Sequence, residues 1–350
     1  MGKVEPNRTF GKSAAKILLK KYRKNTFKKS AAKPVIKIYN VIFFNIEMCN
    51  IKLKYQLYYM DWNYKIQNFT ILNKDIKLNV MTHNDNKIYY KAVLIHLHGL
   101  GSHFQTEYDC MNRFDNRVIK LEKLNIISYG LELRGHGLSE GNKCYINNFN
   151  DYLSDVKCLV NYIKLYHKNL PIFILGESMG GAVAIEYCIK YNNTISGIIL
   201  LSPMCNTNQP LIMIYIILVL SYIIPTWKLI NFPIDNLKLS EYRESKKKCK
   251  YYNKEPIMIC TGRECYKTIV HIKKNSYLFN TPVLAIHARN DKIVNYSDTK
   301  IFIDNCISDD KKMLLFNRGE HNLLVPTSID DIKPNIVFNY ICNWLNERIV

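Results

Sequence analysis

A serine in a glycine-rich turn is the residue of this chain best placed by type and spacing to do covalent chemistry. Ser178 lies at the centre of Gly176-Glu177-Ser178-Met179-Gly180, between the apolar run 171–175 and the helix-like run 182–187. A strand that turns this sharply into a helix lifts the hydroxyl above the sheet edge, and the glycines leave room that side chains would fill. A helix N-terminus also favours developing negative charge. The pattern predicts a nucleophile; the alternative is an ordinary strand-to-helix turn.

A serine hydroxyl needs a base within hydrogen-bond reach, and the base needs an acid that fixes its tautomer. In one known arrangement the acid follows the serine along the chain and the histidine comes last. Asp291 directly follows the apolar run 281–287, and His321 follows the run 312–316 ahead of the last helical segment. We therefore expect Ser178, Asp291 and His321 to form a catalytic triad. The competing acids lack that position directly after a strand or adjoin the histidine itself: Asp298, Asp304, Asp309 and Glu320.

The oxyanion that forms when a serine attacks a carbonyl also needs two preset donors. The first expected donor is the backbone N–H of Met179, directly after the nucleophile. The second is the N–H of Leu100, in a loop that follows the apolar run 89–97 and has Gly99 and Gly101 on either side. His98 begins that loop, and we expect it to be structural because His321 already supplies the base.

Strand-like and helix-like runs alternate along most of the chain, which is 350 residues long and 48% hydrophobic. That length suffices for one large α/β domain with an insertion, or for two small domains. The alternation predicts an α/β class with a mostly parallel, doubly wound sheet. The expected strands are 65–72 and 75–81, which form a hairpin, and 89–97, 126–129, 171–175, 197–201, 281–287 and 312–316; helices are expected at 152–166 and 336–345.

Residues 206–278 interrupt this alternation and contain the most apolar stretch, 211–224. Fourteen residues are too few to cross a bilayer, which needs about 20. Three interpretations stay open: a packed helix of a cap over the site, a helix that also forms a wall of an acyl pocket, and a lid that dips into lipid. In the second, Ile217 and Leu220 would contact the substrate.

The net charge of +20 is concentrated at the N-terminus, because residues 1–40 hold 12 Lys/Arg and one acidic residue. The surplus thus belongs to an extension, expected at 1–60, and does not indicate nucleic-acid binding. A solvated disordered tail and a basic helix lying on an anionic membrane are both compatible with it. Eleven scattered cysteines without a C-x-x-C pair favour a reducing compartment without zinc. We therefore expect a cytoplasmic location, and peripheral contact with an anionic membrane stays open.

Four segments together resemble one branch of the α/β-hydrolases, that of the monoacylglycerol lipases and lysophospholipases. They are His98–His103, Arg134–Gly141, Gly176–Gly181 and Tyr252–Pro256, and the resemblance extends over about residues 60–347. It implies an α/β-hydrolase fold with a helical cap (lid) insertion at about 206–278, within a domain spanning 61–350. It also implies hydrolysis of single-chain glycerolipid esters through a seryl acyl-enzyme, without metal or other cofactor. Glu132 and Ala288 depart from the usual Asp and Gly of that branch.

Other functions stay open at this stage. Transfer of the acyl group to an alcohol and hydrolysis of small esters use the same residues. The non-enzymatic alternative is a lipid-binding scaffold that keeps the fold but has no catalytic activity. Arg134 and His136 are expected to support the site rather than to take part in the reaction.

Overall fold

The computed structural model describes residues 66–83, 89–104, 120–207, 209–230, 244, 247–328 and 331–349. The chain divides into two compact units, Met1–Val41 and Ile42–Val350, and every described residue lies in the second. The basic extension expected at 1–60 therefore lies outside the described residues.

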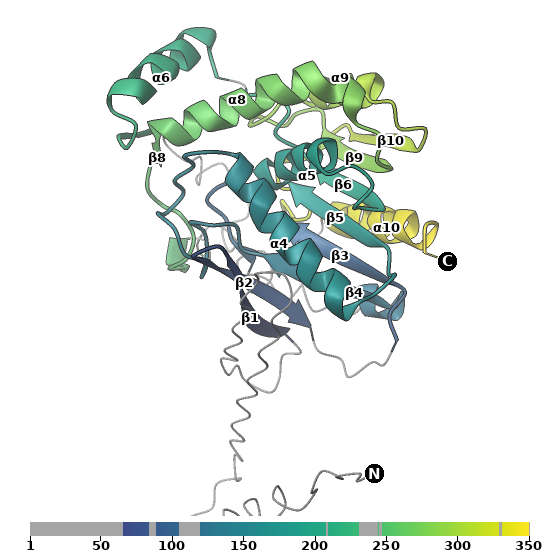
Figure 1. Cartoon of the computed structure of the whole chain (residues 1–350). Helices are drawn as coiled ribbons and strands as arrows, with labels where there is room; N and C mark the ends of the chain where they lie inside the picture. The colour runs from purple at the N-terminus through teal and green to yellow at the C-terminus, as the bar shows by residue number, and fades with distance from the viewer. Residues whose placement is uncertain are drawn as a thin grey trace, which may run out of the picture. The chain divides into compact units, whose positions relative to one another are not determined.

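An open sheet forms the centre of the second unit (Figure 1). Its eight strands, in the described part of the chain, follow the spatial order β1-β2-β4-β3-β5-β6-β9-β10. The strands β1 and β2 form the expected antiparallel hairpin, and from β4 onward all neighbours are parallel. The bounds are β1 Ile66–Asn73, β2 Ile76–His83, β3 Ala92–Leu97, β4 Ile126–Leu131, β5 Ile172–Glu177, β6 Gly197–Leu201, β9 Val283–Ala288 and β10 Lys311–Phe316. All of the strands expected from the sequence are present, with ends shifted by a few residues.

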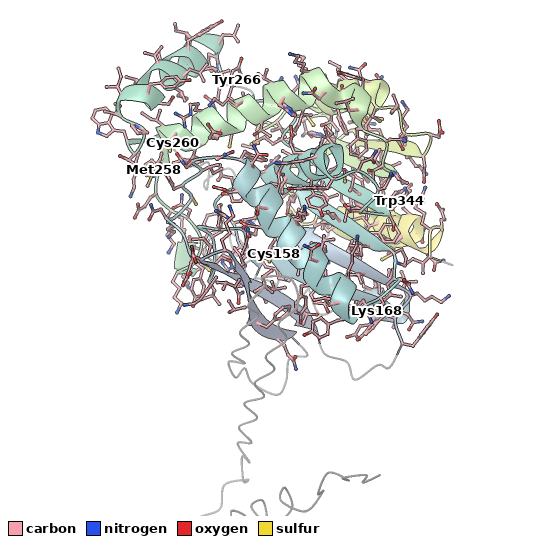
Figure 2. The ribbon with its side chains drawn as sticks, viewed as in Figure 1. Cys158, Lys168, Met258, Cys260, Tyr266 and Trp344 are labelled. Carbon is pink, nitrogen blue, oxygen red and sulfur yellow. The ribbon has the colours of Figure 1, made fainter. Side chains whose placement is uncertain are left out.

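Helices cover both faces of this sheet because its central strands are apolar on both sides. On one face lie α4 (Asn150–Tyr166) and α5 (Met179–Lys190), and on the other α10 (Lys333–Asn346). Side chains of one strand alternate between the two cores: Val93 of β3 packs with α4 and α5, and Leu94 with α10. Trp344 on α10 meets Phe173 of β5 edge to face, with ring centroids 6.0 Å apart (Figure 2). The helix α9 (Tyr296–Asn305), between β9 and β10, was not expected.

The segment between β6 and β9 holds elements that do not join the main sheet, and we call residues 206–278 the insertion. It contains α6 (Leu211–Ile223), the small pair β7 (Lys228–Ile230) and β8 (Ile257–Met258), α8 (Ile259–Asn275) and the 3₁₀ turn η2 (Ser276–Leu278). Figure 1 shows α6 packed along α8 rather than on the sheet. None of the helices in the described ranges combines the length and apolarity that crossing a membrane requires.

Most of the apolar side chains of α6 are exposed, which a fully packed helix would not show. Only Ile214, Ile217 and Ser221 are buried on it. Its exposed large apolar side chains are Leu211, Ile212, Met213, Tyr215, Ile216, Val219, Tyr222 and Ile223. The sequence could not indicate which face would be buried, because a helix that is apolar all round has no polar side.

A buried ion pair fixes the loop after β4 to the rest of the domain. Arg134 forks onto Asp155 of α4, with Nε–Oδ2 and Nη2–Oδ1 distances of 2.8 and 2.6 Å. Asn73, at the end of β1, donates from Nδ2 to the same carboxylate at 2.7 Å. Burial raises the pKa of Asp155, while the bonds from Arg134 and Asn73 favour its ionised form. Arg134 therefore has the supporting geometry that its position in the sequence suggested.

Breaking this pair should cost far more stability than breaking an exposed one. We expect Arg134→Leu to lower the free energy of unfolding by about 2–3 kcal/mol, because it leaves the Asp155 charge buried; Arg134 is partly exposed, so the loss falls below that of a fully buried pair. Lys300→Leu, which breaks the exposed Lys300–Asp304 pair, should cost under about 1 kcal/mol. Urea denaturation measures both. Equal losses would contradict the buried-pair account, and the double variant Arg134→Leu/Asp155→Leu should recover part of the stability.

Candidate active site

Ser178 adopts a backbone conformation that non-glycine residues rarely take. It lies between β5 and α5 with φ 54° and ψ −116°, and such a conformation costs on the order of 1–3 kcal/mol. Hydrogen bonds on both sides hold it: its N–H donates to Leu201 O at 3.0 Å. Its carbonyl accepts from the N–H groups of Gly181, Ala182 and Met204 at 3.0, 3.3 and 2.9 Å. The turn predicted from the glycine pattern is present. Hydrogen bonds to β6 and to the loop after it hold the strained backbone of Ser178 in place.

The glycines around Ser178 are required by backbone packing. A Cβ on Gly176 would lie 2.5 Å from Gly180 O, and a Cβ on Gly180 would lie 2.3 Å from Leu97 O at the end of β3. Both distances are shorter than any real contact, and in each case the obstacle is backbone. The end of β5, the start of α5 and the end of β3 can therefore approach this closely only because Gly176 and Gly180 have no side chains.

The loop after β3 lies directly against the serine. A Cβ on Gly99 would be 3.3 Å from Ser178 Cβ and 3.8 Å from Ser178 Oγ. Leu100 follows Gly99 in this loop, and Met179 is the first residue of α5, where backbone N–H groups have no partner within the helix. The two expected oxyanion donors therefore belong to segments on either side of Ser178; their assignment remains a proposal.

His98 holds this loop in place. Its Nε2 accepts from Leu133 N–H at 3.1 Å, so Nδ1 carries the proton and donates to Gly99 O at 2.8 Å. The side chain is fully buried, and that burial lowers the pKa of His98 well below its ordinary value, with His136 adding to the effect. His98 is thus neutral at pH 7 and fixes the backbone next to Ser178, in keeping with a structural role.

Asp291 and His321 are hydrogen-bonded to each other, with Nδ1–Oδ2 2.8 Å. The other carboxylate oxygen of Asp291 accepts from the N–H groups of Ile293 and Val294 at 2.8 and 3.2 Å. Burial by itself would raise the pKa of Asp291, but hydrogen bonds from His287 and His321 outweigh it, so that this pKa lies below its ordinary value. An ionised Asp291 fixes the His321 tautomer in which Nε2 is the acceptor.

The carboxyl ends of β5, β9 and β10 meet at one edge of the sheet, because these strands run parallel with β6 between β5 and β9. Ser178, Asp291 and His321 each follow one of them. Two competing acids, Asp298 and Asp304, lie on α9; Asp298 accepts from Asn206 Nδ2 at 2.6 Å and Asp304 pairs with Lys300.

The two residues expected at the substrate lie on α6. Ile217 is buried and Leu220 is half-buried on that helix, whose main contacts are with α8.

A second histidine contacts the acid and was not identified from the sequence. His287 of β9 is fully buried, and its Nε2 lies 3.2 Å from Asp291 Oδ2. Its Nδ1 lies 3.0 Å from Thr299 Oγ1 on α9. Since Asp291 and Val294 O both offer acceptors to Nε2, the proton is on Nε2 and Thr299 donates to Nδ1. The alternation of side chains along a strand could have placed His287 on one face of the sheet. It could not have predicted α9, whose Thr299 completes this chain of hydrogen bonds.

Residues 89–327 match the model of the Hydrolase_4 family, described as serine aminopeptidase, S33. The chain belongs to this family. The matched range includes β3 to β10, the insertion, and the serine, aspartate and histidine described above. Peptidases and esterases of this kind can use the same nucleophile, base and oxyanion donors, so that membership does not by itself select a substrate.

Curated relatives extend over most of the chain. The monoglyceride lipase of Rattus norvegicus is 24% identical over 270 residues, covering 74% of this chain and 84% of the relative. A monoglyceride lipase homolog of Monkeypox virus is 26% identical over 270 residues, covering 75% and 91%.

Solved structures show the same α/β-hydrolase fold. A soluble variant of monoglyceride lipase from Saccharomyces cerevisiae, in complex with a substrate analog, superposes with a TM-score of 0.66 at 20% identity and covers 88% of this chain and 98% of its own. Paleococcus ferrophilus monoacylglycerol lipase gives a TM-score of 0.63 at 19% identity and covers 73% and 94%. The α/β-hydrolase fold expected from the sequence is confirmed.

His287 should affect turnover through Asp291 without touching substrate. We expect His287→Leu to reduce kcat/KM for a chromogenic short-chain ester about tenfold, because Asp291 loses a donor that orients it. More of the carboxylate charge then acts on His321, so the acid limb of the kcat/KM profile should move to higher pH. His287→Gln, which retains an N–H, should restore part of both. An unchanged pH profile in a folded His287→Leu protein would contradict the positioning role.

Proposed function

We propose that this protein is a serine hydrolase that cleaves the carboxylic ester of single-chain glycerolipids, monoacylglycerol or lysophospholipid, through a seryl acyl-enzyme. The observation that carries the proposal is the 2.8 Å bond between Asp291 and His321 at the sheet edge that also presents the strained Ser178. That arrangement provides a base in a defined tautomer at the same edge of the sheet as a serine held in a turn suited to a nucleophile.

In the proposed reaction, Ser178 Oγ attacks the ester carbonyl carbon while His321 Nε2 takes the hydroxyl proton. The N–H groups of Leu100 and Met179 stabilise the oxyanion. Collapse of the intermediate expels the glycerol alcohol, which receives the proton from His321, and leaves an acyl group on Ser178. Water, deprotonated by His321, then attacks the acyl-enzyme and releases the fatty acid. Asp291 remains ionised throughout and stabilises the imidazolium that forms twice in the cycle.

Two observations favour a lipid ester over a small polar one. The curated relatives named above are a monoglyceride lipase and a monoglyceride lipase homolog, and the solved yeast relative holds a substrate analog. The insertion also carries a helix, α6, that is apolar on nearly all sides, with Ile217 buried and Leu220 half-buried. An apolar wall stabilises a bound acyl chain by about 0.8 kcal/mol for each buried methylene, which favours medium or long single chains.

The nucleophile is tested most directly by Ser178→Ala. We expect kcat to fall by about 10⁴-fold or more with the melting temperature little changed, because the variant keeps the turn and removes only the attacking oxygen. A fluorophosphonate probe should label wild-type protein and not the variant. Ser297→Ala, at the start of α9, is the matched control and should keep both activity and labelling. Turnover close to wild type in folded Ser178→Ala protein would contradict the mechanism.

The acyl wall is tested by chain-length preference. Ile217→Asp with Leu220→Asp should lower the ratio of kcat/KM for a long-chain ester to that for a two-carbon ester at least about tenfold, since the short acyl group needs little wall. Val219→Asp, on the exposed face of the same helix, is the control and should leave that ratio near wild type. If both variants changed the ratio equally, α6 would not line the pocket through Ile217 and Leu220.

A further inference from the structure

A second nucleophile, base and carboxylate lie together outside the triad, where the insertion meets the loop after β3. Cys249 Sγ is 3.1 Å from His103 Nε2, and His103 Nδ1 is 3.6 Å from Glu132 Oε1. The side chains of His103 and Glu132 are almost fully buried, and Cys249 is partly exposed. The three residues come from distant parts of the sequence, so that only the folded chain assembles them.

Glu132 directs one oxygen of its carboxylate toward His103. Its Oε2 accepts from Asn79 Nδ2 at 3.0 Å and from Leu138 N–H at 2.6 Å. Its Oε1 is buried and has no hydrogen-bond partner among the described residues, and His103 Nδ1 faces it at 3.6 Å. A buried carboxylate oxygen without a donor is unfavourable, and a proton on His103 relieves that cost. Glu132 thus favours the tautomer of His103 that carries its proton on Nδ1, which leaves Nε2 to accept from the Cys249 thiol.

The charged groups around Cys249 also bear on its reactivity. Burial lowers the pKa of His136 to about 4 and that of His98 well below its ordinary value, so that neither of these histidines adds a positive charge near His103 at pH 7. Cys249 itself is flanked in the chain by Lys248 and Lys250. Cations near a cysteine stabilise its thiolate, which is the nucleophilic form.

We propose that Cys249 is a covalent modification site for α,β-unsaturated carbonyl compounds, activated by His103 and Glu132. In the proposed step the Cys249 thiol passes its proton to His103 Nε2, and the thiolate attacks the β-carbon of the electrophile. The carbon–carbon π electrons move onto the carbonyl oxygen as an enolate. His103 then returns the proton to the α-carbon, so that one S–C bond forms and nothing leaves. The addition needs no oxidant, reductant or metal.

Modification of Cys249 would alter the hydrolytic site by displacing the loop after β3. This consequence rests on the proposed function. His103 follows Gly101 by two residues, and Gly101 O accepts from the backbone N–H of Asn253 in the insertion at 2.9 Å. Tyr251 also meets the His103 ring edge to face, with centroids 5.7 Å apart. An adduct on Cys249 cannot keep the S–H···N contact. The segment 249–253 and the loop carrying Leu100 would therefore shift together.

The reactivity is tested with acrylamide on the full-length protein, followed by peptide mass spectrometry of each cysteine over time. Cys158 on α4 (Figure 2) and Cys342 on α10 are internal comparators, since both are partly exposed and burial raises the pKa of each to about 11. We expect Cys249 to be modified at least about tenfold faster than either at pH 7. His103→Gln and Glu132→Gln should each slow Cys249 about tenfold or more and leave the comparators unchanged. Equal rates at the three cysteines, or unchanged Cys249 rates in both folded variants, would overturn the proposal.

The coupling is tested by short-ester turnover after the same treatment. Wild-type protein should lose most of its activity in step with Cys249 modification, and Cys249→Ser should start near wild type and resist acrylamide. Full activity at complete Cys249 modification would overturn the coupling. Ser178→Ala protein separates the two proposals: rapid Cys249 modification there supports the new site whether or not Ser178 is the nucleophile.

Discussion

The turn between β5 and α5 exists because three stretches of backbone come closer together than side chains would allow. Gly176 packs on the carbonyl of Gly180, and Gly180 packs on the carbonyl of Leu97 at the end of β3. This close approach forces Ser178 into its strained conformation and brings the loop at Gly99 against its hydroxyl. The position of Ser178 and that of the adjacent loop are therefore set by one packing constraint.

The hydrogen-bond partners of two buried polar groups in this region, Asp291 and His98, determine whether each is charged. Asp291 is ionised because two histidines and two backbone amides donate to it, despite its burial. His98 is neutral for the opposite reason, since burial is not compensated by a carboxylate and its two nitrogens bond to backbone groups. In the proposed mechanism both protonation states are needed: the charged Asp291 orients the base, and the neutral His98 accepts from Leu133 N–H and donates to Gly99 O, which holds the loop that carries Leu100.

The insertion is joined to the core by polar contacts as well as by the apolar packing of Ile269 and Ile272 of α8. Asn253 donates to Gly101 O, Thr261 Oγ1 donates to Cys144 O at 2.8 Å, and His271 of α8 meets Glu186 of α5 at 2.7 Å. The helix α6 packs on α8. Any substrate-dependent movement of α6 would thus be transmitted through α8 and the segment near Asn253. That segment touches the same loop that carries the proposed oxyanion donor.

The sequence by itself determined the sheet, the turn at Ser178 and the order of serine, aspartate and histidine. These depend on local patterns, since apolar runs of strand length and paired glycines leave few alternatives, and parallel strands must bring their carboxyl ends to one edge. The bond between Asp291 and His321 agrees with that reasoning, although the catalytic roles remain proposals. Tertiary structure alone decided which face of α6 is exposed, because an all-apolar helix carries no directional signal. It also decided the contacts of His287 with Thr299 and of His103 with Cys249, the latter 146 residues apart in the chain. Residue spacing cannot specify such pairs, because they depend on how α9 and the insertion pack against the sheet.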